Sequence, residues 1–297
     1  MAGQIRCILF DVGYTLWERI LPDSALVAKN INQALLYLQE YIDPALFQKL
    51  DHEQVKHELL PALMSELDRE ESKDPNYEPD FGQVTTKVLT RFGLPAIEAR
   101  AGQRLFSTLQ VSAAATRRLF PDALATLREL RARGYLLGIV TNRSWGGPPF
   151  LADLQQMGLL DLFPINAIAI SADLGIRKPH AEIFRYALQA LMVSPTEAAM
   201  VGDSLYADVG GAQALGITTI WKPTSRLYSS VRSSDHLSDS TTLTPATLFS
   251  AGLAYEQQRR HHQINIAPPD YTIEHLSELL SMFSIASEAS AYDTQSA

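Results

Sequence analysis

Short apolar runs alternate with amphipathic stretches over much of the chain. Five runs are almost wholly apolar and end at a glycine, a proline or a polar residue: 7–10, 135–140, 165–170, 198–201 and 217–221. Runs of this length and composition are typical of strands that are buried on both faces of a sheet. Between the later runs, apolar residues recur at helical spacing. Strands that alternate with helices in this way predict an α/β fold built on a parallel sheet.

Residues 22–106 show helical rather than strand periodicity. The first helix is predicted from apolar residues at helical spacing, with Asp23 or Ser24 as its N-cap: Leu26, Ile31, Leu35, Leu38 and Ile42. Asp43 followed by Pro44 predicts the start of a second helix, which Pro61 should kink or end. We expect a loop over 70–80 and further helices over 81–92 and 96–109. This region therefore predicts a helical module inserted after the first strand.

The C-terminal third departs from the alternating order. Residues 224–267 are rich in Ser and Thr and contain the adjacent pair His261 and His262. We expect a long loop or partly disordered insertion here, because such a segment buries little apolar area. Adjacent histidines do not face one another on a helix or a strand, so we do not expect a metal site at this pair. A closing helix is predicted over 273–283, followed by a frayed tail over 284–297.

Composition and charge narrow the class of protein. The chain has 297 residues, 46% of them hydrophobic, and a net charge of −8, which argues against nucleic acid as a partner. The single cysteine, Cys7, lies in a buried run and fits a reducing compartment. No apolar run is long enough to span a membrane, and the N-terminus leads almost directly into the first strand. We therefore expect a soluble cytoplasmic protein, whose oligomeric state the sequence leaves open.

Polar side chains follow four of the predicted strands. They are Asp11, Thr141 with Asn142, Lys178, and Asp203 with Asp208. In a parallel sheet these strand ends lie at one edge and can converge there. Asp11 taken alone could simply cap a turn, but the other three groups favour a site. Carboxylates without cysteine or histidine suit Mg²⁺, and a lysine beside a hydroxyl suits a phosphate. The residues therefore favour Mg²⁺-assisted phosphoryl chemistry.

The same four segments resemble the motifs of the haloacid dehalogenase (HAD) superfamily of hydrolases. The matching segments are 9–16, 139–142, 175–179 and 201–208. The resemblance implies a Rossmann-like core with a helical cap inserted after the first motif. The boundaries expected from it are a core over 1–16 and 118–283, a cap over 17–117, a flexible insertion over 224–267 and a tail over 284–297.

The resemblance also implies a role for each matching residue. Asp11 would be the nucleophile that takes up the phosphoryl group of a small phosphorylated substrate. Thr141 and the Asn142 amide would hold phosphoryl oxygens, and the catalytic Lys178 would neutralise them and orient Asp11.

A magnesium ion is implied as the cofactor. The Asp11 carboxylate, the Gly13 backbone carbonyl and Asp203 would hold it, with Asp208 as an outer support.

Gly13 departs from the pattern of similar phosphatases, which usually carry a second aspartate at this position as general acid and base. Loss of that help typically costs about 10²–10⁴-fold in rate. Tyr14, a cap residue or a metal-bound water could replace it, so we expect a phosphatase whose turnover is weakened by this change.

Two alternatives remain open. One is a protein of the same fold that binds or regulates without turnover. The other is a hydrolase resembling dehalogenases or phosphonoacetaldehyde hydrolase. The latter needs a Schiff-base lysine in the cap, for which three residues are available: Lys29, Lys49 and Lys56.

Overall fold

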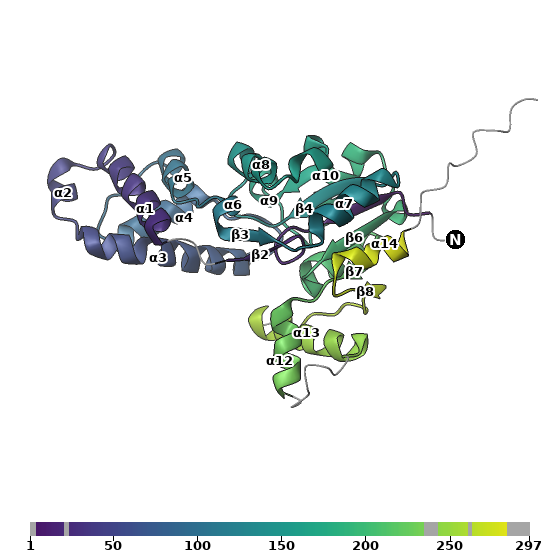
Figure 1. Cartoon of the computed structure of the whole chain (residues 1–297). Helices are drawn as coiled ribbons and strands as arrows, with labels where there is room; N and C mark the ends of the chain where they lie inside the picture. Colours follow the sequence, from purple (N-terminus) through teal and green to yellow (C-terminus); the bar gives the residue numbers. More distant parts are fainter. Residues whose placement is uncertain (1–3, 21–23, 235–242, 261–262, 284–297) are drawn as a thin grey trace, which may run out of the picture.

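A computed structural model describes residues 4–20, 24–234, 243–260 and 263–283. Its centre is a six-stranded sheet in the order β5-β4-β1-β6-β7-β8, in which every neighbouring pair is parallel (Figure 1). The strands are β1 (Cys7–Phe10), β4 (Leu136–Thr141), β5 (Ile168–Ile170), β6 (Ala198–Gly202), β7 (Thr218–Trp221) and β8 (Tyr271–Thr272). The predicted α/β fold with a parallel sheet is confirmed.

Helices cover both faces of this sheet. On one face, α7 (Ala123–Ala132), α8 (Gly147–Gln156) and α14 (Leu279–Met282) contribute to an apolar cluster with Ile8 and Phe10. On the other face, α10 (Ala181–Leu191) packs against Cys7 and Leu9. Successive side chains of a strand point to opposite faces, so a strand covered on both sides must be apolar throughout. This explains the uninterrupted apolar runs in the sequence.

The helical region forms a separate lobe, at the left of Figure 1. Its helices are α1 (Ser24–Gln39), α2 (Pro44–Gln48), α3 (His52–Lys73), α4 (Phe81–Arg91) and α5 (Ala99–Thr108). They share an apolar core of their own, which includes Leu35, Leu59 and Phe106. The lobe therefore buries most of its apolar stripes within itself, and Trp145 from outside it stacks on Phe106.

Details of this lobe differ from the sequence prediction. Asp43 caps α2 as expected, because its carboxylate accepts a hydrogen bond from the Ala45 amide at 2.8 Å. Pro61, however, does not end a helix, since α3 continues through it to Lys73. His57 and Pro61 are both exposed, so water can bind the carbonyl that proline leaves without a donor. The predicted N-cap Asp23 lies outside the described residues.

Two short strands that the sequence did not predict connect the lobe to the sheet. They are β2 (Trp17–Arg19) and β3 (Arg117–Leu119), which pair antiparallel where the chain leaves the core and returns to it. The short helix α6 (Ala113–Thr116) precedes β3.

The predicted loop over 224–267 is wrong for most of its length. It contains α12 (Ser225–Ser234) and α13 (Pro245–Arg260), which lie below the sheet in Figure 1. Three of their apolar side chains pack in a small cluster with Leu205 and Trp221: Leu227, Val231 and Leu248. Few apolar residues are enough here because they fall on the faces that meet the core. Residues 235–242 and the pair at 261–262 lie outside the described residues.

The approach of α13 to the core is close at Gly252. A Cβ atom at this position would lie 2.8 Å from a ring atom of Trp221. Only glycine therefore allows the helix axis to lie this near to β7.

The C-terminal part also differs from expectation. Tyr271–Thr272 forms the edge strand β8, and the predicted helix over 273–283 is a 3₁₀ turn, Leu276–Glu278, followed by the single-turn α14. The predicted tail over 284–297 lies outside the described residues. Among the helices of the described ranges, none combines the length and apolar character needed to cross a membrane.

Candidate active site

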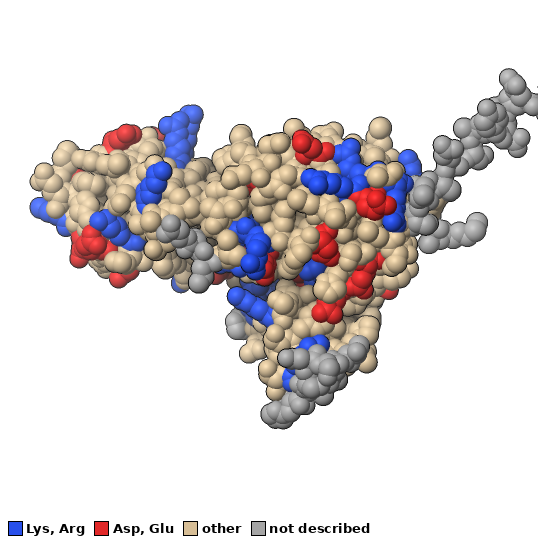
Figure 2. Space-filling view, in the orientation of Figure 1, with Lys and Arg blue, Asp and Glu red and all other residues tan. Residues whose placement is uncertain are grey.

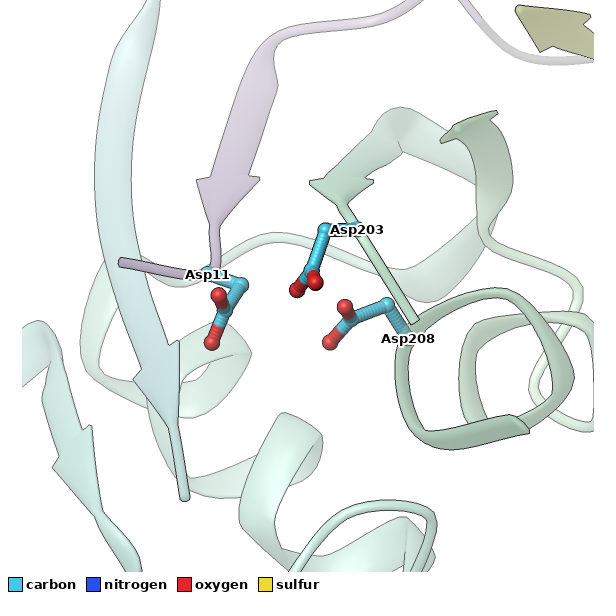
Figure 3. Close-up of side chains that lie close together, drawn as sticks. All are labelled: Asp11, Asp203 and Asp208. Atoms are coloured by element: carbon cyan, nitrogen blue, oxygen red, sulfur yellow. The ribbon is translucent and has the colours of Figure 1, made fainter. Parts of the chain in front are cut away.

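Three carboxylates meet at the carboxyl edge of the sheet (Figure 3). Asp11 follows β1 and Asp203 follows β6, and these two strands are paired, with Phe10 opposite Val201. Asp208 lies in a π-helical turn, Leu205–Gly210, directly after β6. One oxygen from each carboxylate lies within 4.8 Å of the others. The structure therefore brings together the three acids that the sequence placed at strand ends.

Lys178 is buried between two of these acids. Its Nζ atom lies 2.6 Å from Asp11 Oδ1 and 2.7 Å from Asp208 Oδ1, and it donates to the Val140 carbonyl at 2.7 Å. Burial by itself would lower the pKa of Lys178, but the charges of Asp11 and Asp208 outweigh it and raise this pKa. Lys178 therefore stays protonated; it donates hydrogen bonds to Asp11 and Val140 and forms an ion pair with Asp208.

Asn142 holds the loop that carries Lys178. The Lys178 amide donates to Asn142 Oδ1 at 2.8 Å, and Asn142 Nδ2 donates to the Lys178 carbonyl at 3.0 Å. The side chain of Asn142 is thus a clamp on the backbone of Lys178. Thr141 is the buried last residue of β4, next to this clamp.

The charges of the site do not balance. Burial raises the pKa of Asp203 well above its ordinary value, and the charges of Asp11 and Asp208 raise it further. Burial likewise raises the pKa of Asp208 to about 6, although Lys178 opposes this shift. Three carboxylates face one ammonium group, so a divalent cation with oxygen ligands fits the remaining negative charge.

Local hydrogen bonds hold two of the three acids. The Ser204 amide donates to Asp208 Oδ2 at 3.0 Å, and the Thr15 hydroxyl donates to Asp11 Oδ2 at 3.3 Å. A Cβ atom on Gly202 would lie 2.2 Å from the Asp208 carboxyl carbon. Glycine at this position therefore leaves the space that Asp208 occupies.

Gly13 lies in the turn two residues beyond Asp11 and forms an isolated bridge with Trp17. A Cβ atom at Gly13 would meet no other atom within 4 Å. The space for a side chain is therefore present at the position where the sequence lacks an acid.

The sequence analysis missed Glu256 of α13. Its carboxylate accepts hydrogen bonds from the Leu205 amide at 2.6 Å, the Tyr206 amide at 3.0 Å and the Ser204 hydroxyl at 3.1 Å. These donors lie at the N-terminal end of the turn that carries Asp208. A carboxylate at this end of a helical turn is stabilised by the partial positive charge of the free amide groups. Glu256 and Arg260 are four residues apart, a spacing that could have indicated a helix in this segment.

Comparisons with known proteins agree with this arrangement. A sequence model of the family described as haloacid dehalogenase-like hydrolase matches residues 5–216. Over 103 residues, 34% of this chain, the sequence is 41% identical to a glyceraldehyde 3-phosphate phosphatase of Pyrococcus furiosus. That match covers 40% of the relative, so the chain spans about two fifths of its length.

Other relatives match over a longer stretch. A glyceraldehyde 3-phosphate phosphatase of Methanopyrus kandleri is 29% identical over 224 residues, 73% of this chain and 83% of the relative. Among solved structures, a HAD phosphatase from Thermococcus onnurineus has a TM-score of 0.50 and 22% identity, over 94% of this chain and 97% of that one. This likeness shows the fold.

We expect Asp203→Asn to separate charge repulsion from metal binding. Without a divalent cation, the variant should unfold at a higher temperature than the wild type, because it lacks one of three like charges. Mg²⁺ at about 100 times its dissociation constant should stabilise the wild type by about 2.7 kcal/mol and the variant much less. Thermal unfolding with Mg²⁺ and with a chelator measures both effects. Asp161→Asn, at an exposed acid, is the control, and an undiminished Mg²⁺ effect in Asp203→Asn would contradict the assignment.

We expect Glu256→Ala to weaken the same cation site from a distance. Loss of hydrogen bonds to a charged group should cost about 1.5–3 kcal/mol of stability and loosen the turn that carries Asp208. The midpoint of a Mg²⁺ titration, followed by thermal unfolding, should rise. Glu256→Gln keeps one acceptor oxygen, so its Mg²⁺ midpoint should lie between those of the wild type and Glu256→Ala. Gln258→Ala, at an exposed position of the same helix, should have the wild-type midpoint. Unchanged Mg²⁺ midpoints in Glu256→Ala would show that α13 does not support the site.

Proposed function

Because the chain belongs to the haloacid dehalogenase-like hydrolases, we propose that it is a Mg²⁺-dependent phosphatase acting on a small phosphorylated metabolite through Asp11. The observation that carries this proposal is the Asp11–Lys178–Asp208 cluster with Asp203 beside it. Three convergent carboxylates repel one another unless a cation lies between them, so they favour a metal-dependent reaction over a metal-free dehalogenase. The relatives that are named phosphatases support the same choice.

In the proposed reaction, an Asp11 carboxylate oxygen attacks the phosphorus atom and the bond to the ester oxygen breaks. The leaving alkoxide takes up a proton, and water then hydrolyses the aspartyl phosphate. Lys178 holds Asp11 Oδ1 at 2.6 Å and so keeps the carboxylate oriented. Thr141 and the backbone amide of Asn142 are proposed to bind phosphoryl oxygens at the end of β4.

The cation is proposed to be held by Asp11, Asp203 and the Gly13 carbonyl, with Asp208 as support. When bound, Mg²⁺ would offset negative charge on the carboxylates and the phosphoryl group. Lys178 neutralises part of this charge in any case, because it pairs with both Asp11 and Asp208.

Asp11→Asn tests the nucleophile. The amide cannot form the aspartyl phosphate, so release of inorganic phosphate from phosphate esters should fall by about 10³-fold or more. The measurement is a phosphate-release screen with Mg²⁺ over a panel of small esters. Asp68→Asn, at an exposed acid of α3, should keep full activity. Equal activity of Asp11→Asn and the wild type would refute the proposal.

Gly13→Asp tests whether the missing acid limits the rate. The position has room for a side chain, so the variant should gain a general acid and raise kcat for alkyl phosphates by about 10²–10⁴-fold. Gly13→Asn has nearly the same shape but no acid, and should not gain. A wild-type rate that matches Gly13→Asp would mean that another group already supplies the proton.

Gly13 also favours a second candidate, a protein of this fold that binds phosphorylated ligands without turnover. In that case Mg²⁺ and beryllofluoride bind, yet no ester is hydrolysed by the wild type. A reaction of the phosphonoacetaldehyde hydrolase type is less well supported. Lys29 and Lys49 are exposed, and Lys56 is paired with Glu53 at 2.6 Å on the surface of α3.

A further inference from the structure

The two-stranded sheet β2–β3 places like charges opposite one another. Arg19 lies opposite Arg117 in the register, an arrangement that is unfavourable in a strand pair. The next pair is matched instead, since Glu18 lies opposite Arg118 and forms an ion pair at 2.5 Å. Figure 2 shows basic side chains gathered over these strands, where the helical lobe joins the sheet. One face of the small sheet is thus neutral and the other is strongly basic.

Arg143 adds a third cation to the basic face. Alternation along β2 and β3 puts Trp17 on the same face as Arg19 and Arg117. The guanidinium carbon of Arg143 lies 5.8 Å from the Trp17 ring centroid and 4.1 Å from that of Phe150. These rings fix the plane of the guanidinium group without neutralising its charge.

No acid pairs with these three arginines in the ranges 4–20, 24–234, 243–260 and 263–283. Burial and, to a smaller extent, the charge of Arg117 lower the pKa of Arg143 to about 10. The charge of Asp153 is near enough to affect the pKa of both Arg117 and Arg143. Its carboxylate, however, already accepts hydrogen bonds from the Ser112 hydroxyl and the amides of Ala113 and Ala114. Arg143 Nε donates to the Trp145 carbonyl at 3.3 Å, and its terminal nitrogens form no ion pair in these ranges.

The cluster borders the loop that carries the proposed nucleophile. Arg143 directly follows Asn142, and the charge of Asp11 is near enough to oppose the lowering of the Arg143 pKa. Arg117 lies opposite Arg19 of β2, the strand into which this loop leads. Arg19 is exposed, while Arg117 and Arg143 are progressively more covered. Positive charge therefore extends from the exposed surface of the β2–β3 sheet to the edge of the carboxylate site.

We propose that Arg143, Arg117 and Arg19 form a second anion subsite, which binds a carboxylate or a second phosphate on the leaving-group side of the substrate. This inference rests on the proposed phosphatase function and specifies its substrate class. A guanidinium group presents two parallel donors that match either anion. The carboxylate cluster alone would repel such a substrate, and the arginines offset that repulsion.

A matched pair of substrates tests the subsite. Phosphoglycolate and ethyl phosphate differ only in a carboxylate that replaces a methyl group, and ethane-1,2-diol bisphosphate supplies a second phosphate instead. The wild type should prefer one or both of the doubly anionic esters in kcat/KM by about 10–100-fold, the effect expected for hydrogen bonds between charged groups. Whichever ester is preferred identifies the anion.

Variants at the arginines should reduce this preference. We expect Arg117→Met and Arg143→Met each to lower the ratio of kcat/KM between the preferred ester and ethyl phosphate by about 10-fold or more. Arg143→Lys keeps the charge but not the two parallel donors, and should retain part of the ratio. Arg118→Met, on the neutral face of the same sheet, is the control. Arg143 packs on Phe150, so Arg143→Met could fail to fold. In that case the kcat/KM ratio of Arg117→Met, at a more exposed position, still tests the subsite.

Binding to Asp11→Asn separates this inference from the proposed function. Calorimetry in that background compares phosphoglycolate with ethyl phosphate without turnover. If no ester is hydrolysed by the wild type, a binding preference that Arg117→Met removes supports the subsite while the phosphatase proposal fails. If esters are hydrolysed with a ratio that neither Arg117→Met nor Arg143→Met changes, the subsite is overturned and the phosphatase proposal stands.

Discussion

The buried ammonium group of Lys178 is the constraint on which the site depends. A buried charge is costly unless it is paired, and this one is paired twice, with Asp11 at 2.6 Å and Asp208 at 2.7 Å. These partners follow two different strands, so the sheet must hold three loops within hydrogen-bond reach of a single atom. The third acid, Asp203, forms no ion pair in the described ranges, and burial together with the charges of Asp11 and Asp208 raises its pKa well above the ordinary value. The arrangement that stabilises Lys178 therefore places three carboxylates around one ammonium group, and a further cation would reduce their mutual repulsion.

Contacts from outside the sheet hold the loops that carry these groups. Arg177, next to Lys178, pairs with Glu71 of α3 at 2.6 Å and with Glu78 at 2.9 Å. On the other side, Glu256 of α13 holds the start of the Asp208 turn. The helical lobe and the α12–α13 segment are thus connected to the site through several ion pairs and hydrogen bonds. A movement of either element has to break these contacts or carry the loop with it.

The sequence predicted the sheet and its acids for the same physical reason. Strands covered on both faces must be apolar, so a polar residue such as Asp11 or Asp203 at the end of such a run marks a strand end, and parallel strands bring their ends to one edge. β2, β3 and β8 are two or three residues long and have no detectable periodicity. α12 and α13 were missed because a few contacts, such as those of Leu227 and Val231, decide their burial within a polar composition. Glu256 was lost with them, since its role exists only once α13 is folded against the core.

Gly13 lies between two regions of opposite charge on one short loop. Asp11 at the start of this loop belongs to the carboxylate cluster, and Trp17 at its end lies beside the guanidinium group of Arg143. A phosphate ester is itself an anion, so the carboxylates repel it unless cations lie as close to the ester as the carboxylates do. Lys178 and a divalent cation can offset this on the phosphoryl side, and the arginines can do so on the side of the leaving group. A substrate with an anion at each end therefore suits the charge distribution better than one with a single phosphate, and binding energy from its remote end could support a reaction that lacks an acid at residue 13.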